Sequence, residues 1–441
     1  MHIHLCPTPH HLIYLHPTMT TKLISIAIVG GGIGGLCLAI GLLQHPHLKV
    51  TIYEAAPVFS EIGAGVGLGP NAQRALSLIS PAAERAFVSQ ATGNLSPGLE
   101  DVWFDFRCGM KDREGEMLGV VRNQTGQRTI HRARLLDGLI KLIPDGVGRF
   151  GKRLARLEEQ SQSVTMFFDD GTSAKADAVI GADGIHSIVR RELLGMSHPA
   201  VRPAFTGSIA YRGLVPMEIA QTATGGFADT ARIWCGTEGL VMSYPIEHGE
   251  TVNVVAARSK VQWLEYSSQT STDAIRENML EDYINWGAIP RRLLETMEHP
   301  TLWAVSHHPS APYFNKGNIA MMGDAAHAMS PYQGAGAGQA IEDALTLSAV
   351  FGHVQTVDQI APALAAYDAV RRPRSQKVVN TSREQLDMLT FNDGVVNGDS
   401  EMWTQAMIER MDWLWNGDLV KQNKEAVDLF LQSSRETQVV F

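Results

Sequence analysis

Residues 23–48 form the first hydrophobic stretch of the chain, and they include no Asp, Glu, Lys or Arg. A stretch of this length can indicate a membrane-spanning helix. Its six glycines instead favour a buried strand, a tight turn and a buried helix. We therefore predict a strand at 23–29, a helix at 36–44 and a second strand at 49–53, which make one βαβ unit, and no membrane span.

The middle of the chain shows shorter apolar runs, which are typical of strands joined by turns. Runs at 164–168 and 174–180 flank the sequence Asp-Asp-Gly-Thr and predict a β-hairpin. The second run leads into a turn of small residues, GADGIHS, at 181–187. A buried strand that ends at such a turn is typical of the edge where an α/β sheet binds its ligand.

Alternation of apolar and polar residues follows, and it is clearest at 208–214, 240–246 and 251–257. This period of two predicts an antiparallel sheet, distinct from the βαβ part. Helical patterns return at 340–351 and 361–379. The patterns together predict an α/β fold, in which a Rossmann-like domain is joined to an antiparallel-sheet domain and to C-terminal helices.

Composition limits what such a fold can do. A chain of 441 residues with 44% hydrophobic residues is long enough for two domains with a substantial core. The net charge of -9 argues against nucleic acid as a partner, because neutralising phosphates requires a basic surface. The four cysteines are far apart and form no C-x-x-C pair, which favours free thiols in a reducing, cytoplasmic compartment.

The first 18 residues differ from the rest, because they carry five histidines and three prolines. The histidine spacing matches no metal-ligand pattern, and the prolines prevent a regular scaffold. We predict a disordered extension at 1–18, with Met19 as an alternative start, and no metal site.

The most specific chemical signal is the glycine-rich turn of the βαβ unit, GGGIGG. Gly30 permits the tight turn, Gly32 lets the backbone approach a pyrophosphate, and Gly35 allows the helix to pack closely on the strand. Glu54 ends the second strand, 22 residues after Gly32, where its carboxylate can accept hydrogen bonds from ribose hydroxyls. The unit predicts dinucleotide binding and leaves both NAD and FAD open.

Two other motifs supply acidic candidates. In GDAAHAMSPYQGAGAGQ, at 323–339, Asp324 precedes a glycine-rich turn and a helix whose N-terminus can face an anion or a flavin ring. Asp183 of GADGIHS is expected near the same ligand. For each residue the alternative is a helix cap, with Arg190 neutralising Asp183 in the second case.

The remaining candidates carry weaker signals. Gly67, in the glycine-rich loop 61–71, is a position where a backbone amide could touch a ligand. Arg132 could reach a pyrophosphate, although a surface charge is the simpler interpretation. Arg212 and Tyr244 lie on strand-like segments, where a polar side chain either faces a cavity or is structural.

Two groups of residues near the C-terminus have simpler interpretations. The arginine cluster at 371–374 is expected to form a solvated face or a set of ion pairs, and the tryptophans at 403, 413 and 415 are expected in the core.

Taken together, GGGIGG with Glu54, GADGIHS and GDAAHAMSPYQGAGAG resemble the three signatures of the FAD-dependent aromatic hydroxylases. These are the single-component flavoprotein monooxygenases of the p-hydroxybenzoate hydroxylase type. The resemblance extends from about residue 25 to about residue 383, with the motifs in the right order. Within the family, the chain is most similar to the salicylate hydroxylases and to fungal hydroxylases that dearomatise phenols.

The resemblance implies FAD as the bound dinucleotide and NADPH or NADH as a transient electron donor. It implies that Arg212 and Tyr244 hold and polarise a phenolate, and that Pro331 lines the site beside the flavin ring. The residues that it assigns to cofactor binding are Gly30, Gly32, Gly35, Glu54, Gly67, Arg132, Asp183, Asp324, Gly336 and Ala337.

The implied activity is hydroxylation of a phenol or phenolic acid with dioxygen through a flavin hydroperoxide, by a monomer or homodimer. A dearomatising hydroxylase of a polyketide-derived phenol and an FAD oxidoreductase that transfers no oxygen remain alternatives. We expect the FAD-binding domain at 19–94, 119–196 and 300–384, the substrate domain at 95–118 and 197–299, and a helical segment at 385–441.

Overall fold

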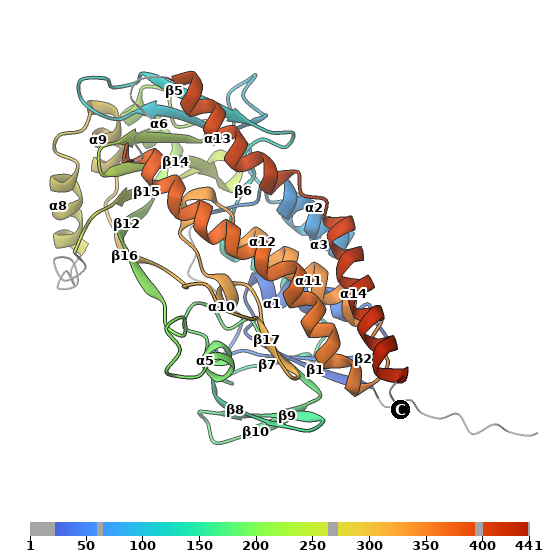
Figure 1. Ribbon diagram of the computed structural model, residues 1–441. Coiled ribbons are helices and arrows are strands. Elements are labelled where there is room, and N and C mark those ends of the chain that lie inside the picture. Colours follow the sequence, from blue (N-terminus) through green and yellow to red (C-terminus); the bar gives the residue numbers. More distant parts are fainter. Residues whose placement is uncertain (1–22, 60–64, 263–271, 393–399, 440–441) are drawn as a thin grey trace, which may run out of the picture.

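The computed structural model describes residues 23–59, 65–262, 272–392 and 400–439. Within them, a six-stranded and a seven-stranded sheet lie at opposite ends of the molecule, and the long helix α12 runs between them (Figure 1). The predicted extension at 1–18 and Cys6 lie outside the described residues. The other three cysteines are free and buried, as predicted.

The six-stranded sheet contains the predicted βαβ unit. Its strands β1 (Ile24–Val29) and β2 (Leu48–Tyr53) pair in parallel, and α1 (Ile33–Leu42) connects them. The helix begins three residues earlier than predicted. Nearly every residue of α1 is buried, because it packs between the sheet and a second helix, α11 (Gly336–Phe351). The other strands of this sheet are β7 (Gly148–Arg149), β11 (Ala178–Gly181), β17 (Asn315–Lys316) and β18 (Ile319–Met321).

The predicted hairpin is present, but its second strand is shorter than expected. It forms from β9 (Ser163–Phe168) and β10 (Ser173–Ala176), and β8 (Leu154–Gln160) completes a three-stranded sheet. The chain leaves this sheet at Asp177, whose carboxylate accepts hydrogen bonds from the backbone N and Oγ of Ser25. The residues after Asp177 therefore pair with β1 instead of continuing the hairpin.

The seven-stranded sheet contains the three alternating segments. They are neighbouring antiparallel strands, as predicted. One pair of strands, β4 and β13, is parallel, so the expectation of a purely antiparallel sheet is wrong there. A long connection separates these two strands, and only a short hairpin would force them to run antiparallel. In sheet order the strands are β16 (Thr301–His307), β12 (Ala204–Pro216), β15 (Thr251–Arg258), β14 (Gly239–Ile246), β13 (Arg232–Gly236), β4 (Val102–Cys108) and β5 (Met117–Arg122).

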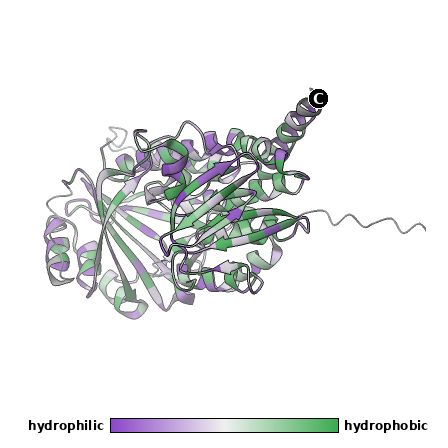
Figure 2. Cartoon of the chain, turned by 90° about the horizontal axis from the view of Figure 1, so that it is seen from below, coloured by the Kyte–Doolittle hydropathy of each residue, from purple (hydrophilic) through white to green (hydrophobic). Residues whose placement is uncertain are grey.

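The two faces of this sheet pack against different elements. The outer face, which includes Tyr211 and Trp234, packs against α6 (Met217–Thr224), α8 (Thr272–Asp282) and α9 (Ala288–Glu295). The inner face, which includes Tyr244, packs against α12 (Ile360–Leu389) and α13 (Ser400–Trp415). Figure 2 shows hydrophobic residues along the strands of both sheets, with hydrophilic residues interspersed.

The C-terminal helices close the structure. α12 continues ten residues past its predicted end and passes through Pro373. α13 and α14 (Leu419–Val439) follow it along one side of the molecule (Figure 1). Trp403 and Trp415 are buried, as predicted, whereas Trp413 is only half-buried. Among the described helices, none combines the length and apolar character needed to cross a bilayer.

Short elements link the two sheets. The ribbon of β3 (Gly65–Gly67) and β6 (Thr129–His131) is antiparallel and leads into α4 (Arg132–Ile140). The other short elements are the helices α2 (Pro70–Ile79), α3 (Pro81–Val88), α5 (Ile188–Leu194) and α10 (Asp324–His327) and the 3-10 helix η2 (Pro331–Gln333).

Candidate active site

The glycine-rich turn after β1 has the geometry that its sequence predicts. Gly30 has a φ of +106°, and a Cβ there would lie 2.3 Å from the carbonyl oxygen of Ala182. A Cβ on Gly35 would lie 2.1 Å from the carbonyl oxygen of Gly30, so the helix packs directly on the turn. A Cβ on Gly32 would meet nothing within 4 Å. The backbone at Gly32, the N-cap of α1, is therefore open to a ligand.

Glu54 closes this turn from the end of β2. One carboxylate oxygen accepts a hydrogen bond from the backbone N of Gly31 at 2.7 Å, and the other accepts one from the backbone N of Ala56 at 2.7 Å. Each oxygen keeps a second lone pair, which can accept from a ribose hydroxyl. The carboxylate thus lies beside the open backbone of Gly32, as its position in the sequence predicts.

The alternative of an N-cap at Asp183 is wrong, because the N-cap of α5 is Ser187, but Asp183 does bond to the start of this helix. Its carboxylate accepts hydrogen bonds from Ser187 Oγ at 2.5 Å and from the backbone N of Ile188 at 2.7 Å. Burial raises the pKa of Asp183 above its usual value, although these hydrogen bonds oppose that shift. Its turn adjoins the glycine-rich turn, because Ala182 packs against Gly30.

Arg190 does not neutralise Asp183, and this expectation is wrong. Its guanidinium is fully buried and donates to the backbone carbonyls of Ala200, Pro309, Ala325 and Ala326. The arginine thereby joins α5 to α10, so it links the GADGIHS and GDAAH motifs. Burial lowers the pKa of Arg190 to about 10.

Asp324 is the exposed acid of the GDAAH motif. It is the first residue of α10, and the N-cap is Gly323, which has a φ of +57°. Its carboxylate has no hydrogen-bond partner in the part of the chain that the structure describes. Asp324 therefore does not cap the helix through its side chain, and its carboxylate is available to a ligand.

A buried network of charged side chains is bonded to the GDAAH motif. Asp343 accepts hydrogen bonds from the backbone N of Gly323 at 2.9 Å and pairs with His327 at 2.6 Å and Arg371 at 2.8 Å. Arg371 also pairs with Glu342 at 2.6 Å. Desolvation opposes ionisation of both carboxyls, but the cations around them hold their pKa values below the usual range.

The arginine cluster that supplies this network is a set of ion pairs, one of the two predicted alternatives. Arg371 is fully buried, Arg374 pairs with Glu342, and Arg372 pairs with Asp368. Sequence analysis did not associate the cluster with the GDAAH motif. Two adjacent acids on α11, a hydrophobic helix, were the available signal for it.

The loop after α10 presents backbone groups to the same region. Pro331 is exposed and begins η2, and Gly336 begins α11. No side chain caps the first turn of α11, so its amides are available for a negatively charged group. Ala337 lies in this turn and is half-buried. The first turns of this 16-residue helix lie against the Asp324 motif, since a Cβ on Gly323 would lie 3.2 Å from Cβ of Ala340.

Gly67 and Arg132 lie on the β3–β6 ribbon and at its end. Gly67 pairs with Thr129, and a Cβ there would lie 3.5 Å from the Gln127 side chain. Arg132 is the first residue of α4, directly after β6, and is half-buried. The ribbon therefore places the two predicted residues on one small unit.

Arg212 lies on the inner face of the seven-stranded sheet. Strand register places it beside Val255, which in turn lies beside Met242. Ala210, Val255 and Val305 form a small apolar cluster around this row. Arg212 is half-buried, and no described carboxylate pairs with it. It is thus a cation in a largely apolar wall, 6.0 Å from the ring centroid of Trp303.

Tyr244 lies on the same face, close enough for the Arg212 charge to lower its pKa, although burial is the larger effect and raises that pKa to about 12. Its hydroxyl donates a hydrogen bond to the carbonyl oxygen of Gly65 at 2.9 Å. A tyrosine has a single hydroxyl proton. Sequence analysis expected the hydroxyl to donate to a phenolate, but in this structure it donates to the Gly65 carbonyl.

A second tyrosine, which the sequence did not indicate, joins the inner face to η2. The hydroxyl of Tyr332 is 2.8 Å from Ser208 Oγ on β12. Burial raises the pKa of Tyr332 to about 12. The only available signal was its position next to Pro331.

These features fit a bound FAD. The open backbone at Gly32 suits a pyrophosphate, the carboxylate of Glu54 suits a ribose, and the uncapped amides of α11 suit the electron-accepting edge of a flavin. The exposed carboxylate of Asp324 is an acceptor of the kind that the hydroxyls of a ribityl chain would need.

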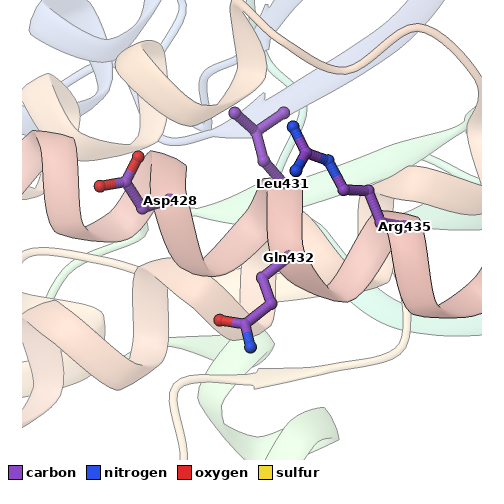
Figure 3. Close-up of a pocket in the computed structure, with 4 residues that line it drawn as sticks. All are labelled: Asp428, Leu431, Gln432 and Arg435. Carbon is purple, nitrogen blue, oxygen red and sulfur yellow. The ribbon is translucent and has the colours of Figure 1, made fainter.

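Of two surface hollows, one lies apart from the candidate residues and the other adjoins them. One, of about 400 Å³, is formed by Asp428, Leu431, Gln432 and Arg435 on α14 and involves none of the candidate residues (Figure 3). The other, of about 460 Å³, lies at the GADGIHS turn. It is lined by Ile185, His186, Ser187, Arg191, Met196, Val201, Arg202, Pro203, Phe205, Ala304 and Ser306.

Comparison with known proteins identifies relatives that span the whole site. The family model described as FAD binding domain matches residues 146–382, and a model of the NAD(P)-binding Rossmann-like domain matches residues 28–60. The chain is 54% identical over 432 residues to a 6-methylsalicylate 1-monooxygenase of Aspergillus terreus, which covers 95% of this chain and 96% of that protein.

Two salicylate hydroxylases are also similar. The enzyme from Pseudomonas putida is 38% identical over 415 residues, covering 91% of this chain and 94% of that protein. The solved structure of a salicylate hydroxylase substrate complex superimposes with a TM-score of 0.82 at 33% identity, and covers 92% of this chain and 98% of that one. The likeness therefore includes both sheets and the helices between them.

Proposed function

This chain belongs to the family of FAD-dependent aromatic hydroxylases, and we propose that its substrate is a 2-hydroxybenzoate. It is an FAD-dependent monooxygenase with FAD and an NAD(P)H donor as cofactors. The substrate class is taken from the names of its relatives, a 6-methylsalicylate 1-monooxygenase and the salicylate hydroxylases. The name of the first relative also suggests that oxygen enters at C1, which bears the carboxylate.

The proposed reaction balances as a decarboxylating hydroxylation. One 2-hydroxybenzoate, one dioxygen, one NAD(P)H and two protons give one catechol, one carbon dioxide, one water and one NAD(P)+. The phenolate raises the electron density at C1, the adjacent ring carbon. When the C–O bond forms there, the bond to the carboxylate breaks, and its electron pair restores the aromatic ring.

Arg212 is the observation on which this proposal rests. A cation on an apolar face, without a described carboxylate partner, suits an anionic aromatic ligand. Its charge lowers the pKa of a nearby phenol, and the apolar residues around it exclude water from the ring. We propose that Arg212 holds the anionic side of the substrate and that Pro331 contacts the ring.

We propose that the six-stranded sheet and the adjoining loops hold FAD. Gly30, Gly32, Gly35, Glu54 and Asp183 serve the ADP half, and Gly67, Arg132, Asp324, Gly336 and Ala337 serve the flavin half. Bound FAD supplies the activated oxygen. The chain itself binds and orients the ring and keeps water away from it.

The hollow at the GADGIHS turn suits the transient donor. Its two arginines, Arg191 and Arg202, can pair with the phosphates of NAD(P)H. We propose that the donor binds there without residing, and that the protein acts in the cytoplasm, where this donor is available.

Carboxyl-labelled substrates test the proposal. The FAD-loaded protein is given NADPH or NADH with salicylate, 6-methylsalicylate or 3-hydroxybenzoate, and labelled carbon dioxide and aromatic products are measured. We expect catechols and carbon dioxide in equal amounts from the first two. The third is a matched control, because its hydroxyl lies meta to C1 and does not activate that carbon. A product that keeps its carboxylate, or that loses aromaticity, would contradict the proposal.

A further inference from the structure

Two side chains of the inner face hold the backbone of Gly65 from both sides. Tyr244 donates its hydroxyl hydrogen to the Gly65 carbonyl oxygen at 2.9 Å, and Asn253 Oδ1 accepts a hydrogen bond from the Gly65 N at 3.1 Å. The two residues are directly opposite each other on the neighbouring strands β14 and β15. We call this pair of hydrogen bonds the Gly65 clamp.

The clamp is buried and closely fitted. Tyr244 is 6% exposed and Asn253 is 0% exposed, so water does not compete for these hydrogen bonds. A Cβ on Gly65 would lie 2.8 Å from Cε2 of Tyr244 and 3.0 Å from Cγ2 of Ile246. Only a glycine allows this strand to lie so close to the sheet.

The clamped strand carries the ribbon that leads to the cofactor residues. β3 pairs with β6, and Thr129 Oγ1 on β6 donates to the carbonyl oxygen of Pro245 on β14 at 2.6 Å. Gly67 is two residues after Gly65, and Arg132 follows β6 directly. Because the ribbon is bonded to the inner face, the position of that face determines where Gly67 and Arg132 lie.

We propose that Tyr244 and Asn253 are positioning residues, which align the flavin-binding ribbon with the Arg212 face through the Gly65 clamp. This rests on the proposed placement of FAD at Gly67 and Arg132. Neither side chain is required to touch the substrate. The competing role for Tyr244 is direct donation to a phenolate, which requires the hydroxyl hydrogen that Tyr244 now donates to the Gly65 carbonyl.

Tyr244→Phe and Asn253→Leu test the clamp, because each removes one of its hydrogen bonds and keeps a similar volume. Tyr211→Phe is the matched control, since this buried tyrosine donates to Asp282 at 2.8 Å from the outer face of the same sheet. For each full-length variant we would measure the dissociation constant of FAD, the product formed per NAD(P)H consumed and the hydrogen exchange of the Gly65 amide.

We expect both clamp variants to weaken FAD binding by about tenfold, the effect of one buried hydrogen bond, and to lower product per NAD(P)H. Asn253→Leu should also speed exchange of the Gly65 amide, whereas Tyr211→Phe should change none of the three readouts. If Tyr244→Phe abolishes turnover while FAD affinity is unchanged and Asn253→Leu is fully active, the clamp proposal is wrong. Hydrogen exchange of the Gly65 amide reports on the clamp even when no substrate is turned over. A protein that is inactive on every 2-hydroxybenzoate would therefore refute the proposed function and not the clamp proposal.

Discussion

The inner and outer faces of the seven-stranded sheet are made from the same strands, yet they carry different chemistry. On the outer face, Tyr211 and Trp234 lie in an apolar cluster beneath three helices. On the inner face, Arg212 follows Tyr211 on β12, and Tyr244 and Asn253 bond to Gly65 of the β3–β6 ribbon. Because neighbouring residues in a strand point to opposite faces, one strand can serve stability and function separately. Changes on the outer face should affect folding, and changes on the inner face should affect the reaction.

The largest expected effect is on the outer face. Trp234→Ala removes a side chain that is 1% exposed and leaves a cavity, so the free energy of unfolding should fall by about 3–5 kcal/mol. Urea denaturation measures this loss. Ile219→Ala, at a position 48% exposed on α6, is the control and should cost under about 0.5 kcal/mol. If the folded Trp234→Ala protein had an altered KM for the aromatic substrate, the outer face would also affect the reaction, and the division between the two faces would be wrong.

The next largest effect is expected at Arg212. Arg212→Ala should reduce kcat/KM by about 100-fold or more, because it removes the cation that holds the phenolate, and FAD should stay bound. Steady-state kinetics and flavin absorbance measure the two quantities. Arg122→Ala is the control, since Arg122 is an exposed arginine of the same sheet that pairs with Asp101. Loss of flavin from Arg212→Ala would show that this residue serves the cofactor.

Alkaline pH should destabilise the protein through Tyr332, whose hydroxyl is hydrogen-bonded to Ser208 of β12. Burial raises the pKa of Tyr332 from 10.0 to about 12, so the native protein keeps a proton that the unfolded chain loses. Stability is therefore fully present below pH 10 and falls from there to about pH 12, by up to about 1.4 kcal/mol per pH unit. Urea midpoints of Tyr332→Phe and the unmodified chain at about pH 9 and about pH 11 measure this. If the urea midpoint fell equally in both proteins between these two pH values, Tyr332 would not be the cause of the alkaline destabilisation.

The smallest expected effect comes from removing a single hydrogen bond on each face of the sheet. Ser208→Ala removes the hydrogen bond to Tyr332, and Tyr211→Phe removes the one to Asp282. Each should lower the free energy of unfolding by about 1 kcal/mol. Only Ser208→Ala should change the KM for the aromatic substrate, because Tyr332 lies next to Pro331. If both variants changed KM equally, the sheet would transmit strain between its faces.

The sequence predicted best what depends on local geometry. The turn at Gly30 and Gly35 needs glycine for reasons that involve only the adjacent strand and helix, and so the βαβ unit, the family and the cofactors could be recognised. The three alternating strands were found for the same reason, because the period of two is a local pattern. The predicted family, fold class and FAD cofactor are confirmed.

Long-range contacts could not be predicted in this way. Asn253 and Gly65 are 188 positions apart, and nothing near either residue indicates the other. Arg190 was assigned to the nearest acid in the sequence, but its partners are backbone carbonyls, and three of the four lie more than 100 residues away. The roles of Tyr244, Arg212 and the other candidate residues remain predictions, which the experiments above address.

The buried charges beneath the GDAAH motif also tie this motif to the last two helices of the chain. Arg371, which holds Asp343 and Glu342, is itself bonded to Gln422 of α14, and Arg374 donates to the carbonyl of Leu414. A nascent chain emerging from the ribosome presents the glycine-rich turn of β1 first, because synthesis starts at that end. The bond between Arg371 and Gln422 can form only after residue 422 has been made. The network beneath the GDAAH motif is therefore complete only near the end of synthesis.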